Sequence, residues 1–129
     1  MLVAASGYRR SLIEAGKVER RHRLSRSRDF DNIYRHGRST STRFLTMHAF
    51  PREDEQSEPR LGLAIPRSVG SAVKRNRLKR MLREVWVMKE RRSGFDYVFV
   101  ARPGLAEAVE SRGFEWLGER VDEVMEKAG

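Results

Sequence analysis

Residues 60–83 read RLGLAIPRSVGSAVKRNRLKRMLR, and two different periods meet within this stretch. Leu61 to Ile65 is a short apolar run with the length of a buried strand. From Ser71 the apolar residues recur at the i, i+3, i+4, i+7 spacing of an amphipathic helix that extends to Arg92. The apolar positions of this helix are Leu78, Met81, Leu82, Val85 and Met88. The stretch therefore predicts a strand followed by a long helix.

The opposite face of this helix carries positive charge of a single sign. Between Lys74 and Arg83 there is no acidic residue, so repulsion weakens the helix unless packing or an anionic partner holds it. Arginine forks match phosphates and guanine edges, and an asparagine between two arginines adds directional hydrogen bonds. We expect this face to bind a folded RNA, with a solvated charged face as the alternative. The candidate residues are Lys74, Arg75, Asn76, Arg77, Lys79, Arg80 and Arg83.

Shorter elements precede this helix. Ser27 suits the N-cap of a short helix with Phe30, Ile33 and Tyr34 on one face, and Gly37 suits its C-terminal end. Residues 44–50 alternate as a strand, and residues 51–59 form an acidic segment bounded by prolines that predicts a hairpin loop.

Two further elements follow the basic helix. Gly94 is expected to end that helix, residues 97–101 have the pattern of a buried strand, and residues 112–127 have that of a last amphipathic helix. The order predicts an α/β (α+β) fold with one sheet and helices packed on it.

Composition limits the classes of function. The 129 residues suit one domain, and 27 basic against 18 acidic side chains give a net charge of +9. The surplus lies in residues 1–43 and 60–92, which alternate with two acidic segments. Such a distribution favours a polyanionic partner, nucleic acid before membrane. The chain has no cysteine and no apolar run of membrane length, so we expect a cytoplasmic protein.

The residues of a catalytic site are not visible in the sequence. His22, His36 and His48 lack cysteine partners and the i, i+4 spacing of a zinc helix. Residues 70–74 resemble a phosphate loop only superficially, because the second glycine and the Lys-Ser/Thr ending are missing. If the protein takes part in catalysis, we expect the chemistry to reside in a partner.

The basic segment also carries a family resemblance. The pattern Arg-Asn-Arg-x-Lys-Arg at residues 75–80, behind an Arg-x-Gly strand, resembles the signature of the bacterial ribonuclease P protein subunit. Supporting matches lie at residues 23–24, 29–39 and 96–102, and the similarity runs from about Arg21 to Lys127. Residues 1–20 are then a basic N-terminal extension, expected to be flexible, and residues 21–129 are the RNA-binding domain.

The resemblance implies a cofactor protein bound to a large catalytic RNA. Together the two would remove the 5′ leader from precursor tRNA by hydrolysis that depends on Mg²⁺. The magnesium would be held mainly by the RNA subunit, and neither an organic cofactor, a membrane nor an obligate protein partner is expected. The implied order is α-β-β-β-α-β-α, with an unusual left-handed connection through the basic helix.

The resemblance also implies a leader-binding cleft between that helix and the sheet. By position the cleft includes Phe30, Tyr34 and His48, with Arg67 near its rim. Family members often carry an aromatic residue where this chain has His48, and a serine followed by two basic residues at 66–68, so leader contacts there are expected to be weaker or differently made. The alternative function is a ribosomal or other structural RNA-binding protein, which would use the basic helix without such a cleft.

Overall fold

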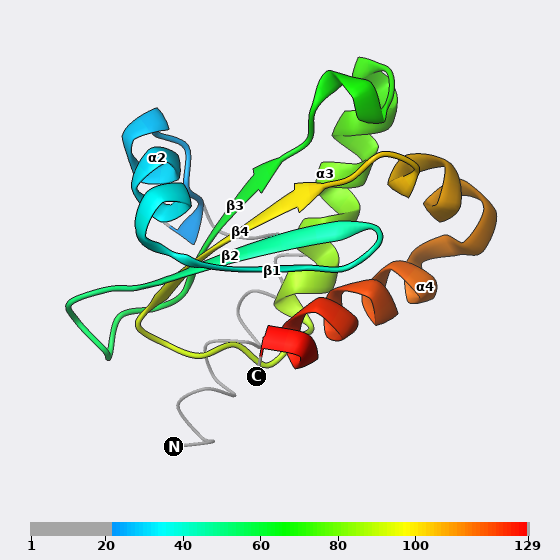
Figure 1. The fold of residues 1–129 in the computed structure, drawn as a ribbon. Helices are drawn as coiled ribbons and strands as arrows, with labels where there is room; N and C mark the ends of the chain where they lie inside the picture. Colours follow the sequence, from blue (N-terminus) through cyan, green and yellow to red (C-terminus); the bar gives the residue numbers. More distant parts are fainter. Residues whose placement is uncertain (1–21, 129) are drawn as a thin grey trace.

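A four-stranded sheet forms the centre of the molecule, with helices on both of its faces (Figure 1). The computed structural model describes residues 22–128, so the predicted extension over residues 1–20 lies outside the described residues. The strands are β1 (Arg38–Ser41), β2 (Leu45–Pro51), β3 (Arg60–Ala64) and β4 (Phe95–Ala101). Their order across the sheet is β1-β2-β4-β3. The single sheet and the order α-β-β-β-α-β-α are confirmed.

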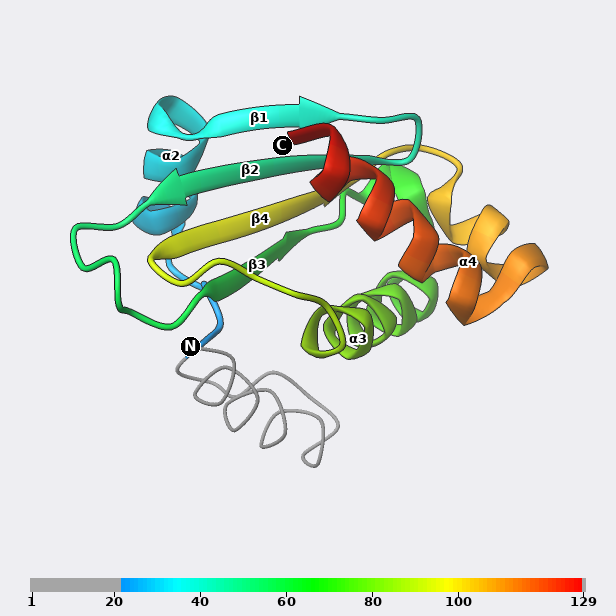
Figure 2. The ribbon, with the colours of Figure 1, turned by 90° about the horizontal axis from the view of Figure 1, so that it is seen from below.

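The connection from β3 to β4 decides the topology. These strands pair in parallel and are joined by α3 (Ala72–Val87), with the short turn η2 (Arg67–Val69) before it. In Figure 2 both strands point to the right, α3 lies on the near side of the sheet, and β4 lies directly above β3. A connection that passes in front of the sheet and ends above the strand where it began is left-handed. The family resemblance implies this left-handed connection, whereas connections between parallel strands are almost always right-handed.

The predicted hairpin at residues 51–59 is wrong. The strands on either side of it, β2 and β3, do not pair, because β4 lies between them and pairs with both. Periodicity identifies strands but not their partners, and β4 comes more than thirty residues later in the chain. The hairpin of this sheet joins β1 and β2, which are antiparallel.

The ends of α2 (Ser27–His36) and α3 differ in part from the predictions. Arg26, not Ser27, occupies the N-cap position of α2 and makes no side-chain cap, whereas Gly37 ends the helix as expected. A Cβ at Gly37 would lie 2.5 Å from the carbonyl oxygen of Ile33, so a side chain there would force the backbone to move. The α3 helix ends at Val87 instead of near Arg92.

Arg91 lies against the C-terminal end of α3. Its guanidinium donates to the carbonyl oxygens of Trp86 and Lys89, and the backbone N–H of Lys89 also donates to the carbonyl oxygen of Trp86. Met88, predicted on the apolar face, lies beyond the helix and is 54% exposed. Gly94 does not end the helix but forms the turn into β4 with φ of +80°.

The last helix, α4 (Leu105–Ala128), starts before the predicted position and contains a kink. Gly113 has φ of +89°, so the backbone leaves the helical conformation at this residue. The predicted segment 112–127 corresponds to the part after the kink. The earlier part, with Leu105, Ala106 and Val109 buried, was missed because it is too short to show a period clearly.

Each face of the sheet buries its own apolar cluster. The large cluster lies between the sheet and α3 and α4, where Trp86 packs edge-on against Tyr97 and Phe99 of β4. The small cluster, on the face that α2 covers, consists of Leu24, Ile33 and Val98. Alternate residues of β4 thus serve both clusters. Within residues 22–128, no helix is long and apolar enough to cross a membrane.

Candidate nucleic-acid interface

The start of α3 fixes the direction in which its basic face points. Ser71 is the N-cap, and its hydroxyl accepts a hydrogen bond from the backbone N–H of Lys74. Leu78, Leu82 and Val85 are buried in the large cluster. The basic side chains therefore lie on the outer face: Lys74, Asn76, Arg77 and Arg80 are exposed, and Arg75, Lys79 and Arg83 are partly buried. The separation into two faces agrees with the prediction.

The cations of this face differ in their partners. The Nε of Arg75 donates to the carbonyl oxygen of Gly70 at 3.2 Å, and the Nζ of Lys74 lies 3.6 Å from a carboxylate oxygen of Glu110. In the part of the chain that the structure describes, the remaining side chains form no salt bridge and no side-chain hydrogen bond: Asn76, Arg77, Lys79, Arg80 and Arg83. These five side chains are available to an external anion.

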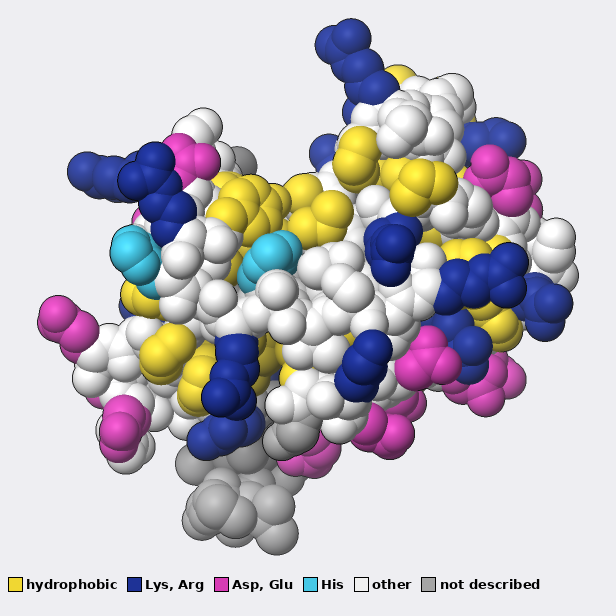
Figure 3. Space-filling model, in the orientation of Figure 1, with side chains coloured by type: hydrophobic (Ala, Val, Ile, Leu, Met, Phe, Trp, Pro, Cys, Tyr) yellow, Lys and Arg dark blue, Asp and Glu magenta, His cyan; other side chains and the backbone are white. Residues whose placement is uncertain are grey.

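Three aromatic rings form a row across the opposite side of the sheet. Phe30 and Tyr34 project from α2 with ring centroids 6.2 Å apart, and His48 of β2 lies edge-on to Tyr34 at 4.8 Å. Figure 3 shows apolar side chains exposed in a hollow between α2 and the upper end of α3. The structure thus brings together three of the four residues predicted for the cleft.

The fourth residue, Arg67, stands apart from the ring row. It is exposed on η2, and it makes no cation–π contact with these rings among the residues described. Arg67 is therefore carried by a different element from the three rings and makes no ring contact with them among the described residues.

Phe30 and Tyr34 have different surroundings. Phe30 packs against the small cluster, and a Cβ at Gly62 would lie 2.8 Å from its ring, so the glycine makes room for it on β3. Tyr34 is 42% exposed. Phe30 thus contributes to the packing of α2, whereas the ring of Tyr34 has a surface that a ligand can reach.

The ring row is uncharged at neutral pH. Burial lowers the pKa of His48, whose Nδ1 is buried and has no hydrogen-bond partner among residues 22–128. Burial, and then the charge of Asp31, raise the pKa of Tyr34. Both groups are therefore neutral near pH 7, and the row offers surfaces for stacking rather than charge.

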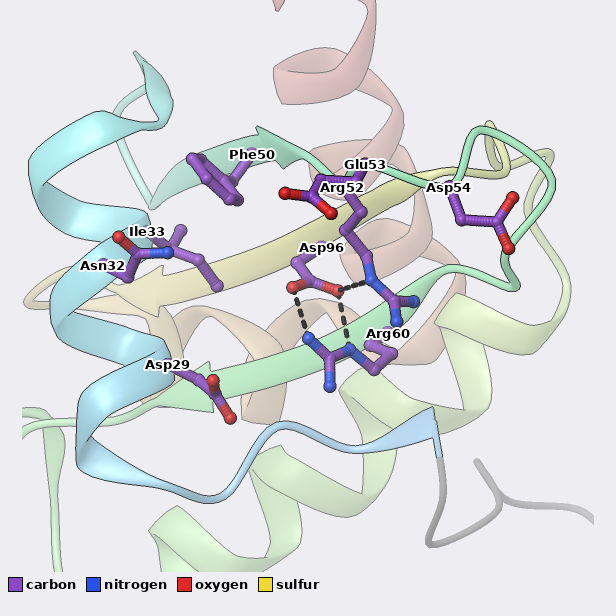
Figure 4. A pocket seen from close by; sticks show the side chains of 9 residues that line it. All are labelled: Asp29, Asn32, Ile33, Phe50, Arg52, Glu53, Asp54, Arg60 and Asp96. Atoms are coloured by element: carbon purple, nitrogen blue, oxygen red, sulfur yellow. Dashed lines mark hydrogen bonds and ion pairs between the residues drawn. The ribbon is translucent and has the colours of Figure 1, made fainter.

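A charged cluster that the sequence did not single out ties β3 to β4. Asp96 is buried and accepts two hydrogen bonds from the guanidinium of Arg60, at 2.8 and 2.7 Å. Arg52 lies 3.7 Å from the same carboxylate, beside a hollow of about 380 Å³ (Figure 4). The hydrogen bond with Asp96 is the main reason that the pKa of Arg60 is raised. This buried charge is paired on both oxygens and has a structural role.

Further carboxylates lie in the same region. Asp29, Glu53 and Asp54 line the hollow beside Arg52 and Arg60. Within residues 22–128, no group of three or more His, Asp or Glu side chains lies close enough together to hold a metal ion.

Comparisons with known proteins agree with this geometry. The family model "Ribonuclease P" matches residues 18–129. The ribonuclease P protein component of Carboxydothermus hydrogenoformans is 37% identical over 81 residues, which is 61% of this chain and 70% of that protein. The corresponding protein of Bacillus cereus strain AH187 is 32% identical over 114 residues, which is 87% of this chain and 95% of that protein.

Solved structures share the fold. The RNase P protein from Thermotoga maritima superposes with a TM-score of 0.71 at 30% identity, covering 78% of this chain and 92% of that one. The Staphylococcus aureus RNase P protein gives 0.69 at 26% identity, covering 83% and 94%. Since the family model covers all of the described residues and a relative matches over almost its whole length, this chain belongs to the family of ribonuclease P protein components, subunits of an RNA-based endoribonuclease.

Proposed function

We propose that this chain is the protein cofactor of ribonuclease P, which binds the catalytic RNA and the 5′ leader of precursor tRNA. Together with the RNA it assists the endonucleolytic removal of the leader, which gives the mature 5′ end of the tRNA. The observation that carries this proposal is the presence of two unlike surfaces on one small protein. Within residues 22–128, five polar and basic side chains of α3 form no salt bridge and no side-chain hydrogen bond, and an uncharged ring row lies across the opposite face of the sheet.

The basic face of α3 binds the RNA subunit. Arg77 and Arg80 are exposed, and a guanidinium can hold a phosphate through two parallel hydrogen bonds. Asn76 lies between Arg75 and Arg77 and adds a directional donor and acceptor. Phosphate contacts of this kind set the orientation of the protein on a folded RNA, and they weaken as salt is added.

The ring row binds the leader as a single strand. Unpaired bases stack on aromatic side chains without a strong sequence preference, and neutral rings suit this task. Tyr34 offers the most accessible ring, His48 extends the row onto β2, and Phe30 supports both from α2. Arg67, exposed on η2, contributes a cation that meets a phosphate of the strand.

Catalysis takes place in the RNA subunit, which also holds most of the Mg²⁺. The magnesium ions supply an activated water and stabilise the charge on the reacting phosphate. Asp96, the buried carboxylate of the hollow beside Arg52 and Arg60, is paired with both guanidinium groups. The protein contributes by binding and orienting the precursor.

Reconstitution tests the proposal. The purified chain, combined with a ribonuclease P RNA at physiological salt, should restore cleavage of the leader, and the RNA-free protein should cleave nothing. Cleavage at the mature end by the RNA-free protein would overturn the division of labour. Tight binding to RNA without restored cleavage would instead favour a structural RNA-binding protein.

A further inference from the structure

Three arginines surround a pair of aromatic rings at the end of the sheet where β2 begins and β4 ends. The rings of Phe44 and Trp116 meet edge-on, with their centroids 5.1 Å apart. The guanidinium carbon of Arg43 lies 5.1 Å from the centroid of Phe44. Those of Arg112 and Arg120 lie 5.9 and 5.2 Å from the centroid of Trp116. We call these five residues the arginine–ring cluster.

Hydrogen bonds hold the turn between β1 and β2, which carries Arg43. The N–H of Thr42 donates to the carbonyl oxygen of Leu45 at 2.8 Å. Arg102, the residue after β4, donates its N–H to the carbonyl oxygen of Phe44 at 3.0 Å and its guanidinium to that of Thr42 at 2.6 Å. The segment after β4 therefore fixes the turn, and with it the backbone of Arg43.

Stacking restrains these arginines and leaves their hydrogen-bond donors open. A guanidinium that stacks on a ring contacts it through its flat face, so the N–H donors around its edge stay accessible. Arg43 and Arg112 are exposed, and within residues 22–128 neither forms a salt bridge or a side-chain hydrogen bond. Arg120 is less exposed, and its Nη1 lies 3.7 Å from a carboxylate oxygen of Glu123. The cluster thus presents two guanidinium groups that no carboxylate of the described residues pairs with.

The type of donor indicates the class of ligand. The planar fork of arginine binds two oxygens of a phosphate through parallel hydrogen bonds, and a fork that is already restrained loses less entropy on binding. All cations of the cluster are arginines. Figure 3 shows Lys and Arg side chains gathered over the turn between β1 and β2 and the adjoining part of α4. Since the proposed function supplies RNA as the polyanion, we expect the ligand to be its phosphate backbone.

The cluster differs in position from the two surfaces described above. It lies on the turn before β2 and on α4, so none of its residues belongs to α3. Phe44 and Trp116 pack against the large cluster, whereas Phe30 of the ring row packs against the small cluster on the other face of the sheet. A phosphate at Arg43 or Arg112 is therefore a third contact.

We propose that Arg43 and Arg112, stacked on Phe44 and Trp116, bind backbone phosphates of a folded RNA in addition to the contacts of α3 and the ring row. This inference rests on the proposed function, which offers two sources of phosphate, the RNA subunit and the body of the tRNA. Phosphate contacts set the orientation of a protein on its nucleic acid. A contact on α4 thus prevents the protein from rotating about the contact that α3 makes.

The test uses two assays, the affinity of the purified chain for the RNA subunit and the affinity of the assembled particle, at saturating protein, for mature and precursor tRNA. In one of these assays Arg43→Gln and Arg112→Gln should each weaken binding at least about fivefold. Each should also flatten the log–log salt dependence by about 0.7 to 0.9, the slope of one phosphate contact. Loss in the first assay identifies the RNA subunit as the source of the phosphate. An equal loss for both tRNAs in the second identifies the tRNA body.

Arg92→Gln is the matched control. Arg92 is also exposed, and its guanidinium carbon lies 4.9 Å from the ring centroid of Phe95, at the opposite end of β4. This variant should change each affinity less than about twofold. Trp116→Leu removes the ring without changing the charge and should weaken binding, whereas Trp116→Phe should retain most of the affinity. Thermal unfolding of each variant confirms that it folds.

Four results would overturn the inference. If the unaltered chain binds its RNAs and both arginine variants behave as Arg92→Gln does, the cluster only packs α4 on the sheet, and the proposed function stands. Weaker binding with an unchanged salt slope would likewise assign the arginines to packing. A loss confined to precursor tRNA would make the cluster part of the leader surface. If the unaltered chain binds neither the RNA subunit nor, in the particle, tRNA, the proposed function fails together with the inference.

Discussion

Tyr34 and His48 show how the surroundings of a side chain decide what it can bind. The two rings lie edge-on to each other, and burial favours the neutral form of each by lowering the pKa of His48 and raising that of Tyr34. The family resemblance predicted that these residues and Phe30 lie together, but not the contact that sets Phe30 apart from them. The difference depends on Gly62, whose missing side chain admits the ring of Phe30 to β3. No local pattern links residues 30 and 62.

Replacing Tyr34 with alanine should weaken the binding of precursor tRNA to the reconstituted particle. A lost stacking contact corresponds to about 1 to 3 kcal/mol per base. Mature tRNA has no leader, so its affinity should stay the same, and Tyr34→Phe should retain most of the affinity for precursor. Filter binding of both tRNAs measures this difference. An equal loss for both tRNAs, or unfolding at a much lower temperature, would show that Tyr34 is a packing residue.

His48 should make the folded protein less stable in acid. Its pKa is lowered by burial, so the unfolded chain binds the proton more readily than the folded one. By linkage, the contribution to stability is constant above the unfolded value of about 6.5 and is lost as pH falls below it. His48→Phe should remove this part of the pH dependence. The melting temperatures of both proteins, compared between pH 7.5 and 5, measure it, and parallel curves would contradict the assignment.

At the level of elements, the sequence predicted whether a segment is a helix or a strand better than it predicted where a helix ends or which strands pair. The period of α3 was readable because its apolar and basic faces are opposite each other. Its end at Val87 is accompanied by a contact from Arg91 to the carbonyl oxygen of Trp86, and such a contact leaves no periodic signal. The pairing of β2 with β4 rather than β3 is likewise set by chain segments far apart in sequence.

The basic face of α3 gives a prediction for the element as a whole. Arg77→Ala should weaken binding to the RNA subunit by about 1 to 3 kcal/mol if its guanidinium holds a phosphate with two hydrogen bonds. Arg77→Lys keeps the positive charge but lacks the planar guanidinium that can form two parallel hydrogen bonds, so it should recover only part of the lost affinity. Titrations at several salt concentrations measure both effects. Negligible losses for Arg77→Ala and for Lys79→Ala alike would mean that the face is only solvated.

At the scale of the whole molecule, the sheet separates the two surfaces. The basic helix packs on one face through the large cluster, and the ring row lies on the other face beside the small cluster. β4 contributes fully buried residues to both clusters, through alternate residues such as Phe99 and Val98. A small protein can in this way contact a large RNA and a second strand at the same time. The sequence indicated both surfaces but not that they are on opposite faces.

This separation predicts that the two surfaces act independently. Arg77 is on α3 and Tyr34 is on α2, which pack on opposite faces of the sheet, and effects of distant residues without shared partners usually add. Arg77→Ala should lower the affinity for the RNA subunit and leave the ratio of precursor to mature tRNA affinity unchanged. Tyr34→Ala should do the reverse.

The combined variant should show both losses, adding within about 0.5 kcal/mol. The measurements are the affinity of each variant for the RNA subunit alone, and the affinities of the assembled particle for the two tRNAs at saturating protein. A coupling well above this value would mean that the leader and the RNA subunit contact a common surface. The sheet would then transmit binding from one face to the other instead of keeping the two contacts apart.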